Sequence, residues 1–295
     1  MNPRQVRTSA RAKINLLLDV GERRTDGYHE VTTIVSTLEL SDTLTLEDAR
    51  MLSLVRHPEQ EFAARDDLAM RAVLLLAEEL GRPPALALEL HKRIPVAAGL
   101  GGGSADAAAA LVGACALWGV ETSAPAVARV ARSLGADVPF LIRGGCALCT
   151  GRGDEVVRSL PSPVVEIVLV NPGVTLSTAA VYAVFDEEPR FAPIDPFPMA
   201  AALESGDVSR VAALLLNDLA EASARVEPSV ATVHEFVGSL PGILGAQVAG
   251  SGATVFGIAR DAASARRAAT AASGHGWWSL ATRTSPASQT AGRPS

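Results

Sequence analysis

The chain has 295 residues, of which 48% are hydrophobic and 20% are charged. This composition predicts a globular protein with a core large enough for one large domain or two ordinary ones. The formal net charge of −6 at pH 7 argues against a broad nucleic-acid-binding surface, because such surfaces are basic.

The sequence shows no apolar run long enough for a membrane span, and its polar beginning is unlike a signal peptide. Three cysteines are an odd number, which disfavours a disulfide framework and leads us to expect a reducing, cytoplasmic location. Cys146 and Cys149 form one C-x-x-C, which favours two small core residues over a redox or zinc site. The five histidines are scattered without metal-ligand spacing.

The N-terminal region begins with strand-like residues 6–20. Lys13 and Asn15 are two residues apart, so on a strand their side chains face the same side. They form either an exposed edge or a functional pair. Residues 31–46 predict two further strands, interrupted near Ser41 and Asp42.

A turn-rich connection over residues 21–30 separates these strands, and Asp26-Gly27 within it is a hairpin signal. Tyr28 and His29 follow directly. Such a pair either packs at a strand edge or offers a flat stacking and hydrogen-bonding site for a base.

The strongest single signal is the glycine-rich stretch P-V-A-A-G-L-G-G-G-S-A at residues 95–105. A predicted strand at residues 86–91 precedes it, and a predicted alanine-rich helix at 104–117 follows, with Ser104 as its N-cap. Glycines bring backbone amides close to an anion, and the N-terminus of a helix presents unpaired N–H groups and a positive dipole end. The stretch fits neither G-x-x-x-x-G-K-[ST] nor G-x-G-x-x-G. We interpret it as a triphosphate-binding loop, the alternative being a mobile loop before a helix.

Other elements of the first half are weaker signals. Asp137 lies in G-A-D-V-P-F and is either a helix N-cap or a placed functional carboxylate. The remaining elements are a polar loop at 48–66 with a short strand at 51–55, a helix at 68–80, a helix at 123–134 capped by Ser123 with Pro125 in its first turn, and a strand at 144–151.

The second half predicts another domain, which opens on the apolar strand 164–171. Residues 175–185 predict a turn followed by the start of a helix, in which Thr178 and Tyr182 are spaced i, i+4. The other expected elements are a proline-rich loop at 187–198, helices at 199–203, 208–214, 228–239 and 261–272, strands at 247–249, 254–259 and 277–282, a glycine turn at 250–253 and a disordered tail at 285–295.

Three stretches together resemble the GHMP kinases, a superfamily named for galactose, homoserine, mevalonate and phosphomevalonate. They are A-R-A-K-I-N-L-L-L near the N-terminus, the glycine-rich stretch at 95–105 and G-A-Q-V-A-G-S-G-A-T-V-F-G, similar to a glycine turn that supports the first loop. The set A-K-I-N-L, D-G-Y-H-E, L-G-A-D-V-P-F and N-P-G-V-T-L-S-T, in this order, resembles the branch that phosphorylates 4-diphosphocytidyl-2-C-methyl-D-erythritol in non-mevalonate isoprenoid synthesis. The resemblance spans about residues 8–283.

The resemblance implies a role for individual residues. Asp137 matches the catalytic base and Lys13 the lysine paired with it. The substrate-binding positions that it implies are Asn15, Tyr28, His29, Thr178 and Tyr182, with Tyr28 and Tyr182 on opposite faces of the cytosine. The implied ATP-binding positions are Asp67, Lys92, Pro95, Val96, Ala97, Ala98, Gly99, Leu100, Gly101, Gly102, Gly103, Ser104 and Ala105.

Two positions depart from the pattern of the resembled branch. Asp67 stands where relatives often carry asparagine, and Tyr182 where some carry phenylalanine. Mg²⁺ is expected for ATP chemistry, but no side chain is marked as its ligand, so no metal residue is assigned.

The resemblance implies an α+β protein of two domains, with a ribosomal protein S5 domain 2-like fold at residues 1–160 and a ferredoxin-like fold at 161–284. The expected partners are ATP and a cytidine diphosphate substrate, with neither nucleic acid nor membrane, and the chain is expected to be a monomer or weak dimer. Two alternatives remain: another GHMP kinase, which would not need Tyr28 and His29, and a binding protein of the same fold without catalysis.

Overall fold

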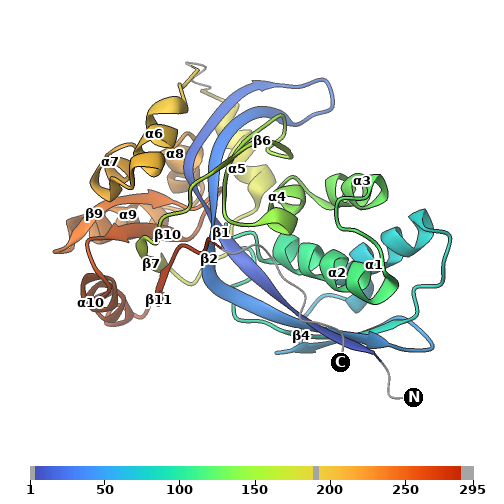
Figure 1. The fold of residues 1–295 in the computed structure, drawn as a ribbon. Coiled ribbons are helices and arrows are strands. Elements are labelled where there is room, and N and C mark those ends of the chain that lie inside the picture. The colour runs from blue at the N-terminus through green and yellow to red at the C-terminus, as the bar shows by residue number, and fades with distance from the viewer. Residues whose placement is uncertain (1–3, 189–192, 287–295) are drawn as a thin grey trace.

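Two long antiparallel strands, β1 (Gln5–Arg23) and β2 (His29–Asp48), run through the structure, a computed structural model that describes residues 4–188 and 193–286. In Figure 1 they are the blue ribbons that join at the hairpin near the top. β1 starts with alternating exposed and buried positions, and from Ala12 to Val20 every residue is buried. Such a run is expected of a strand that is covered on both faces.

The first sheet has seven strands in the order β3-β4-β2-β1-β8, with β5 paired to the other half of β2 and β6 paired to β5. β3–β4 and β1–β8 are parallel pairs, and the other pairs are antiparallel. The bounds are β3 (Ser53–His57), β4 (Leu86–His91), β5 (Cys146–Thr150), β6 (Glu155–Leu160) and β8 (Leu216–Asn217).

β2 corrects one sequence prediction, because it is a single strand through Ser41 and Asp42. Both residues pair with β1, opposite Arg11 and Ala10. The polar dipeptide marks instead the point where β2 changes partner, from β5 to β4. Asp42 is fully buried there, and its carboxylate accepts hydrogen bonds from the backbone of the chain that follows β4.

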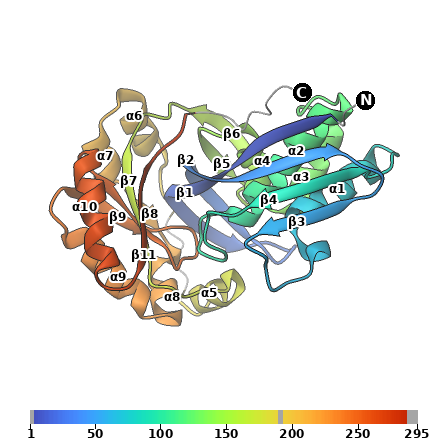
Figure 2. The ribbon, with the colours of Figure 1, turned by 90° about the horizontal axis from the view of Figure 1, so that it is seen from below.

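Four helices cover one face of this sheet (Figures 1 and 2), with the alanine-rich α2 packed between β1, β2 and the other helices. Small side chains allow close approach: a Cβ on Gly113 would lie 2.3 Å from the Leu46 side chain. The bounds are α1 (Leu68–Glu79), preceded by the 3₁₀ turn η1 (Ala64–Asp66), α2 (Gly102–Trp118), α3 (Pro125–Leu134) and α4 (Asp137–Arg143).

Two predicted helix caps are wrong. α2 begins earlier than expected, with Gly101 as its N-cap, so Ser104 lies inside the first turn. Ala124 rather than Ser123 is the N-cap of α3, although Pro125 occupies the first turn as predicted. In both places a glycine or proline sets the backbone angle that starts the helix, so a capping hydroxyl is not required.

The second sheet has the antiparallel order β11-β7-β10-β9, formed by β7 (Glu166–Asn171), β9 (Ile243–Val248), β10 (Val255–Ala259) and β11 (Trp278–Arg283). With α9 (Ser229–Ser239) and α10 (Ala262–Ser273) packed on it, this is a βαββαβ arrangement of ferredoxin-like order. The remaining helices are α5 (Thr178–Phe185), α6 (Phe197–Ser205), α7 (Val208–Ala213) and α8 (Leu219–Val226). The predicted α+β class is confirmed.

The two sheets are tied together by chain that crosses between them. β8 comes from the second half of the sequence but pairs with β1. Near the C-terminus Thr284 bridges to Leu38, and the buried Ser285 donates its N–H to the carbonyl of Thr37. The predicted disordered tail at 285–295 is therefore wrong at Ser285, which is buried and hydrogen-bonded, and residues 287–295 lie outside the described chain. The proposed boundaries at 160 and 284 stay a prediction.

All three cysteines are buried free thiols, and burial raises the pKa of Cys146 and Cys149 to about 12. Thiols that hold their protons this firmly are poor nucleophiles and metal ligands. The interpretation of the C-x-x-C pair as core residues is therefore confirmed. Among the described residues, no helix is both long enough and apolar enough to cross a membrane.

Candidate active site

A cleft of about 400 Å³ lies where the two sheets meet. It collects side chains from β1, β2, the glycine-rich loop, α4, the β5–β6 turn, α5 and the β9–β10 turn. Of the residues predicted from the sequence, it is lined by Lys13, Asn15, Ala97, Ala98, Gly99, Gly101, Gly102, Gly103, Ser104, Asp137, Thr178 and Tyr182. Leu100 and Ala105 are instead buried in the core behind the loop.

The glycine-rich loop fits tightly against the second glycine turn. Gly99 has φ +78°, and a Cβ there would lie 2.1 Å from the carbonyl oxygen of Ala249 and 2.7 Å from that of Gly252. The backbone N–H of Thr254 donates to the carbonyl of Ala98. The two glycine motifs, some 150 residues apart in the sequence, therefore support one another, and only a residue without a side chain fits at Gly99.

The floor of the cleft carries a lysine–carboxylate pair. Lys13 Nζ lies 3.5 Å from Asp137 Oδ2, and the lysine side chain is 7% exposed whereas that of Asp137 is 35% exposed. Asp137 is the first residue of α4, and its side chain does not cap that helix. A carboxylate at this position is stabilised by the helix dipole and by the lysine, while its open side faces the cleft.

Lys13 is held in place by a chain of buried hydrogen bonds. Its Nζ donates to Asn15 Oδ1 at 2.9 Å, Asn15 Nδ2 donates to Thr33 Oγ1 at 2.9 Å, and Thr33 Oγ1 donates to the carbonyl of Leu17 at 2.7 Å. The amide of Asn15 is thereby oriented, and a buried network in which every member has a partner fixes its groups rigidly. Thr33 lines the cleft and was not singled out from the sequence.

A second, smaller hollow of about 180 Å³ lies on the other side of the loop and shares Leu68, Ala97, Gly102 and Gly103 with the cleft. The predicted positions Asp67, Lys92, Pro95 and Val96 line it, together with Gln60, Phe62, Asp66 and Asp106. The N-terminus of α2 thus lies between two hollows, one on each side of the predicted phosphate loop.

At the base of the smaller hollow, Lys92 Nζ lies 2.5 Å from both Asp42 Oδ2 and Asp106 Oδ2. Burial alone would lower the pKa of Lys92, but the carboxylates of Asp106 and Asp42 outweigh it and raise that pKa. Burial likewise raises the pKa of Asp106 well above its ordinary range. Asp106 Oδ1 has no hydrogen-bond partner within the described chain, so a ligand that donates a hydrogen bond can satisfy it.

Asp67, which departs from the pattern of the resembled branch, is engaged by the protein itself. Its Oδ1 accepts from the N–H of Ala69 at 2.9 Å as the N-cap of α1, and its Oδ2 lies 3.6 Å from the buried guanidinium of Arg56. The negative charge of Asp67 therefore compensates the positive charge of the buried Arg56, which a neutral asparagine would not do.

Asp67→Ala should lower the free energy of unfolding by at least about 1 kcal/mol, the usual cost of removing an N-cap side chain. Asp67→Asn keeps a good N-cap side chain and should lower the free energy of unfolding by less. Urea denaturation of the two variants beside the parent protein measures both effects. Equal losses for asparagine and alanine would show that the charge facing Arg56, and not the cap, carries the contribution of Asp67.

The far end of the cleft is aromatic. Tyr182 lines the cleft, with its ring centroid 4.9 Å from that of His29 behind it, and His29 Nε2 lies 2.7 Å from Asp186 Oδ1. Burial raises the pKa of Tyr182 to about 12, and the negative charge of Asp137 adds to this, so its hydroxyl keeps its proton. His29 is itself buried, and Tyr28, 55% exposed, lies at the hairpin turn outside the cleft lining.

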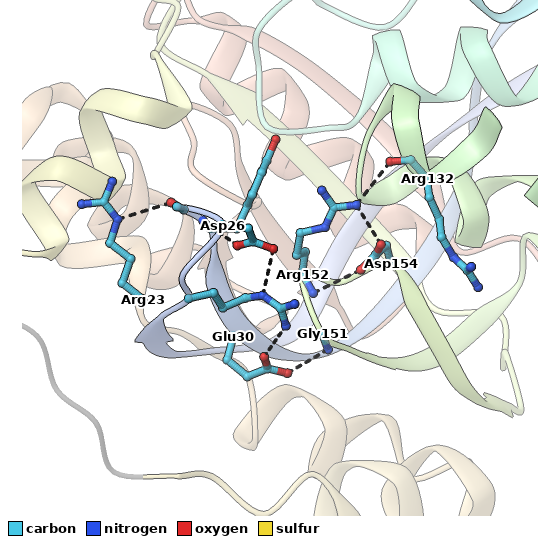
Figure 3. A network of polar contacts seen from close by, with 10 residues as sticks. Arg23, Asp26, Glu30, Arg132, Gly151, Arg152 and Asp154 are labelled. Carbon is cyan, nitrogen blue, oxygen red and sulfur yellow. Dashed lines mark hydrogen bonds and ion pairs between the residues drawn. The ribbon is translucent and has the colours of Figure 1, made fainter. Parts of the chain in front are cut away.

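Arg152 connects Tyr28 to the cleft, which it lines with Gly153. Its guanidinium lies 4.8 Å from the centroid of the Tyr28 ring and donates to Asp154 Oδ2 and to the carbonyl of Arg132. Figure 3 shows this network and the neighbouring one, in which Arg24 bonds Asp26 and Glu30 and Glu30 accepts from the Gly151 amide. A cation is thus fixed at the rim of the cleft beside an exposed aromatic ring.

Arg152, Gly153 and Ser251 are cleft residues that the sequence analysis missed. Ser251 Oγ lies 2.9 Å from Thr178 Oγ1 and comes from the turn between β9 and β10. The one available signal for Arg152 was its position between two glycines, Gly151 and Gly153, in the turn after a predicted strand. Isolated basic residues in turns are too common to predict a site.

The chain is similar to known proteins over most of its length. Residues 67–145 match the family described as GHMP kinases N terminal domain, and residues 199–276 match GHMP kinases C terminal. The chain is 42% identical over 262 residues to a 4-diphosphocytidyl-2-C-methyl-D-erythritol kinase of Pelotomaculum thermopropionicum, covering 88% of this chain and 91% of that one. It is 44% identical over 253 residues to a protein of the same name in Mycolicibacterium gilvum, covering 82% and 78%.

A solved structure gives the same result for the fold. The crystal structure of a 4-(cytidine 5'-diphospho)-2C-methyl-D-erythritol kinase superposes with a TM-score of 0.79 at 35% identity, over 95% of this chain and all of that one. The fold, the glycine loop and the identity over most of both chains lead to one conclusion. The chain belongs to the 4-diphosphocytidyl-2-C-methyl-D-erythritol kinase family of the GHMP kinases.

Proposed function

We propose that this chain transfers the γ-phosphoryl group of ATP to the 2-hydroxyl of 4-diphosphocytidyl-2-C-methyl-D-erythritol, a step of the methylerythritol phosphate route to isoprenoids. The observation that carries the proposal is the Lys13–Asp137 pair, 3.5 Å apart on the floor of the cleft beside the glycine-rich loop. The names of relatives that match most of the chain supply the substrate.

The reaction uses the two charges of this pair in different ways. Asp137 takes the proton of the attacking hydroxyl, whose oxygen bonds the γ-phosphorus while the bond from that phosphorus to the bridging oxygen breaks and ADP leaves. Lys13 stabilises the negative charge that develops on the attacking oxygen. A placed base contributes about 10²–10⁴-fold, and positioning and electrostatic stabilisation supply the rest in phosphoryl transfer.

The phosphates of ATP are proposed to lie on the glycine-rich loop and the N-terminus of α2. The amides of residues 101–104 begin the helix and have no partner within it. The smaller hollow would then take the nucleoside, where Asp106 Oδ1 is free to accept a hydrogen bond. Lys92 reaches this hollow with its charge already neutralised by two carboxylates, so it shapes the pocket rather than attracting phosphate.

Mg²⁺ is expected to accompany ATP. This ion takes one or two protein oxygens beside those of the phosphates, and the Ser104 hydroxyl, which the cleft offers next to the loop, fits that preference. When bound, the ion would neutralise phosphate charge.

The cytidine of the acceptor is proposed to lie at the aromatic end of the cleft, between Tyr28 and Tyr182. His29 supports Tyr182 from behind and is held by Asp186. Asn15 and Thr178 would contact the acceptor between the cytidine and Asp137. Because Tyr28 lies at an exposed hairpin turn, closing the stack requires this turn to move toward the cleft.

Tyr28→Ala should raise the KM for the cytidyl substrate about 5- to 150-fold, because stacking a base on an aromatic ring is worth about 1–3 kcal/mol. The KM for ATP should stay unchanged, since Tyr28 does not line the smaller hollow. Tyr28→Phe is the matched control, because it keeps the ring and loses only the hydroxyl. Steady-state kinetics with each substrate varied in turn measures this, and an unchanged KM for the cytidyl substrate would remove Tyr28 from the site.

The function is tested by an assay of phosphoryl transfer from ATP-Mg to 4-diphosphocytidyl-2-C-methyl-D-erythritol, homoserine and mevalonate in parallel. Turnover of the cytidyl compound alone is the expected result. Turnover of homoserine or mevalonate instead would support a kinase but show that the proposed substrate is wrong. Binding of ATP without turnover of any of the three would favour a binding protein of the same fold.

We also propose a reducing compartment, the cytoplasm, for this chain. The support is chemical: three buried cysteines remain free thiols, and none pairs with another.

A further inference from the structure

Three exposed side chains come together on the far side of β4 from the helices. Glu89 and His91 lie two residues apart on β4 and point to the same side of the sheet. β3 runs parallel to β4 in a register that pairs His57 with His91. The last residue of β3 thus lies beside the last residue of β4, and two histidines flank one glutamate.

The donor atoms of the three side chains converge. Glu89 Oε1 lies 3.2 Å from His57 Nε2 and 3.1 Å from His91 Nε2. The two imidazole rings are stacked, with centroids 4.6 Å apart and 20° between their planes, so both Nε2 atoms face the same carboxylate. One ligand atom from each residue lies within 4.8 Å of the other two.

These separations are close to those that a transition metal imposes. A tetrahedral ion at about 2.0–2.2 Å from each ligand atom requires those atoms to lie roughly 3.3–3.6 Å apart. The two nitrogen–oxygen separations already approach that value, so only a small rotation of the exposed side chains would complete the set. Two imidazoles and one carboxylate are a set that suits zinc, copper or nickel and not calcium or magnesium.

We propose that His57, Glu89 and His91 form a binding site for one divalent transition-metal ion of the zinc class, with a fourth position open to water. The three residues lie outside the lining of the cleft and of the smaller hollow. A hydrogen-bonded cluster without metal is the competing explanation, since one carboxylate oxygen can accept from both imidazoles.

An ion at this site would lie where the ends of β3 and β4 meet, beside the smaller hollow. The carbonyl of His57 accepts a hydrogen bond from the N–H of Lys92 at 2.7 Å, and the chain after His57 supplies Gln60 and Phe62 to the smaller hollow. An ion bridging His57 to His91 would therefore clamp the end of β3 to β4 at the point where the wall of this hollow begins.

The test is a titration of the full chain, without a polyhistidine tag and freed of metal by a chelator, with Zn²⁺ in a calorimeter and with Co²⁺ by visible absorption. We expect one ion per chain for each metal, in the presence of excess Mg²⁺. The Co²⁺ spectrum should show the intense bands of a nitrogen and oxygen site of low coordination number without a sulfur charge-transfer band.

His57→Gln and His91→Gln should each weaken the binding of Zn²⁺ by at least about tenfold, because even loss of a partner that only orients a metal ligand weakens binding about 10–100-fold. Both side chains are about half exposed, so the variants should fold, which circular dichroism verifies. His275→Gln, an exposed histidine elsewhere, is the matched control and should bind like the parent. Absence of stoichiometric binding, a sulfur charge-transfer band, or full binding of Zn²⁺ by a variant that carries both His57→Gln and His91→Gln would each overturn the proposal.

Discussion

Asp137→Asn should lower kcat for phosphoryl transfer by about 10²- to 10⁴-fold, the contribution expected of a placed general base. Asparagine has nearly the shape of aspartate but cannot take the proton of the attacking hydroxyl at neutral pH. Affinity for ATP should stay nearly unchanged, because the glycine-rich loop and the smaller hollow do not depend on this carboxylate. Single-turnover kinetics and a nucleotide-binding titration measure the two effects separately.

Asp261→Asn is the matched control for this prediction. Asp261 is a surface N-cap of α10 that asparagine can replace, and it lies away from the cleft. Its kcat should equal that of the parent protein. If kcat of Asp137→Asn fell by less than about tenfold, below the usual range for a general base, the base would have to be another group.

Gly99→Ala is the second substitution expected to have a large effect. The new Cβ would lie 2.1 Å from the Ala249 carbonyl oxygen, in a backbone conformation with φ +78°. Overpacking costs about 1–3 kcal/mol, and the left-handed conformation costs a non-glycine residue roughly 1–2 kcal/mol more. Denaturation should therefore occur at clearly lower urea concentration, and kcat should fall because the phosphate loop is displaced from its support.

Gly119→Ala separates the two causes. Gly119 has a similar φ of +67°, but a Cβ there would meet nothing within 4 Å. The free energy of unfolding of Gly119→Ala should fall only by the cost of the left-handed conformation. Its kinase activity should be unchanged, since Gly119 lies at the C-terminal end of α2. Equal destabilisation by the two substitutions would mean that the contact between Gly99 and the β9–β10 turn adds nothing to stability.

Local sequence predicted most elements because their signals are local. The strand at residues 6–20, the turn at Asp26-Gly27 and the alanine-rich helix that is α2 are each signalled by neighbouring residues, and the structure contains all three. The break predicted at Ser41 and Asp42 was wrong for the opposite reason. Asp42 is buried there, and its carboxylate accepts hydrogen bonds from the N–H groups of Arg93 and Ile94, some 50 residues away.

The site divides in the same way. Lys13 and Asp137 stood out because their motifs resemble a known superfamily, and the structure brings the pair together across more than a hundred residues of sequence. Thr33 and Arg152 carried no motif, and their place in the cleft follows only from how β2 and the β5–β6 turn pack. The histidines at 57 and 91 likewise appeared scattered, because their proximity depends on the parallel pairing of β3 with β4.

Segments from the second half of the sequence pair with β1 and β2 of the first sheet, and this has a consequence for synthesis on the ribosome. The N–H of Val20 donates to Asp218, and Thr37 donates to the carbonyl of Ser285, which is 248 residues further along the chain. β1 and β2 can pair as soon as they leave the ribosome. The other edge of β1, at Leu17 and Leu18, has no strand partner until β8 has been synthesised. A nascent chain stalled before residue 216 exposes that apolar edge, which is a template for pairing with another chain. Translation pauses that occur before residue 216 is synthesised should therefore favour aggregation more than pauses near the end of the message.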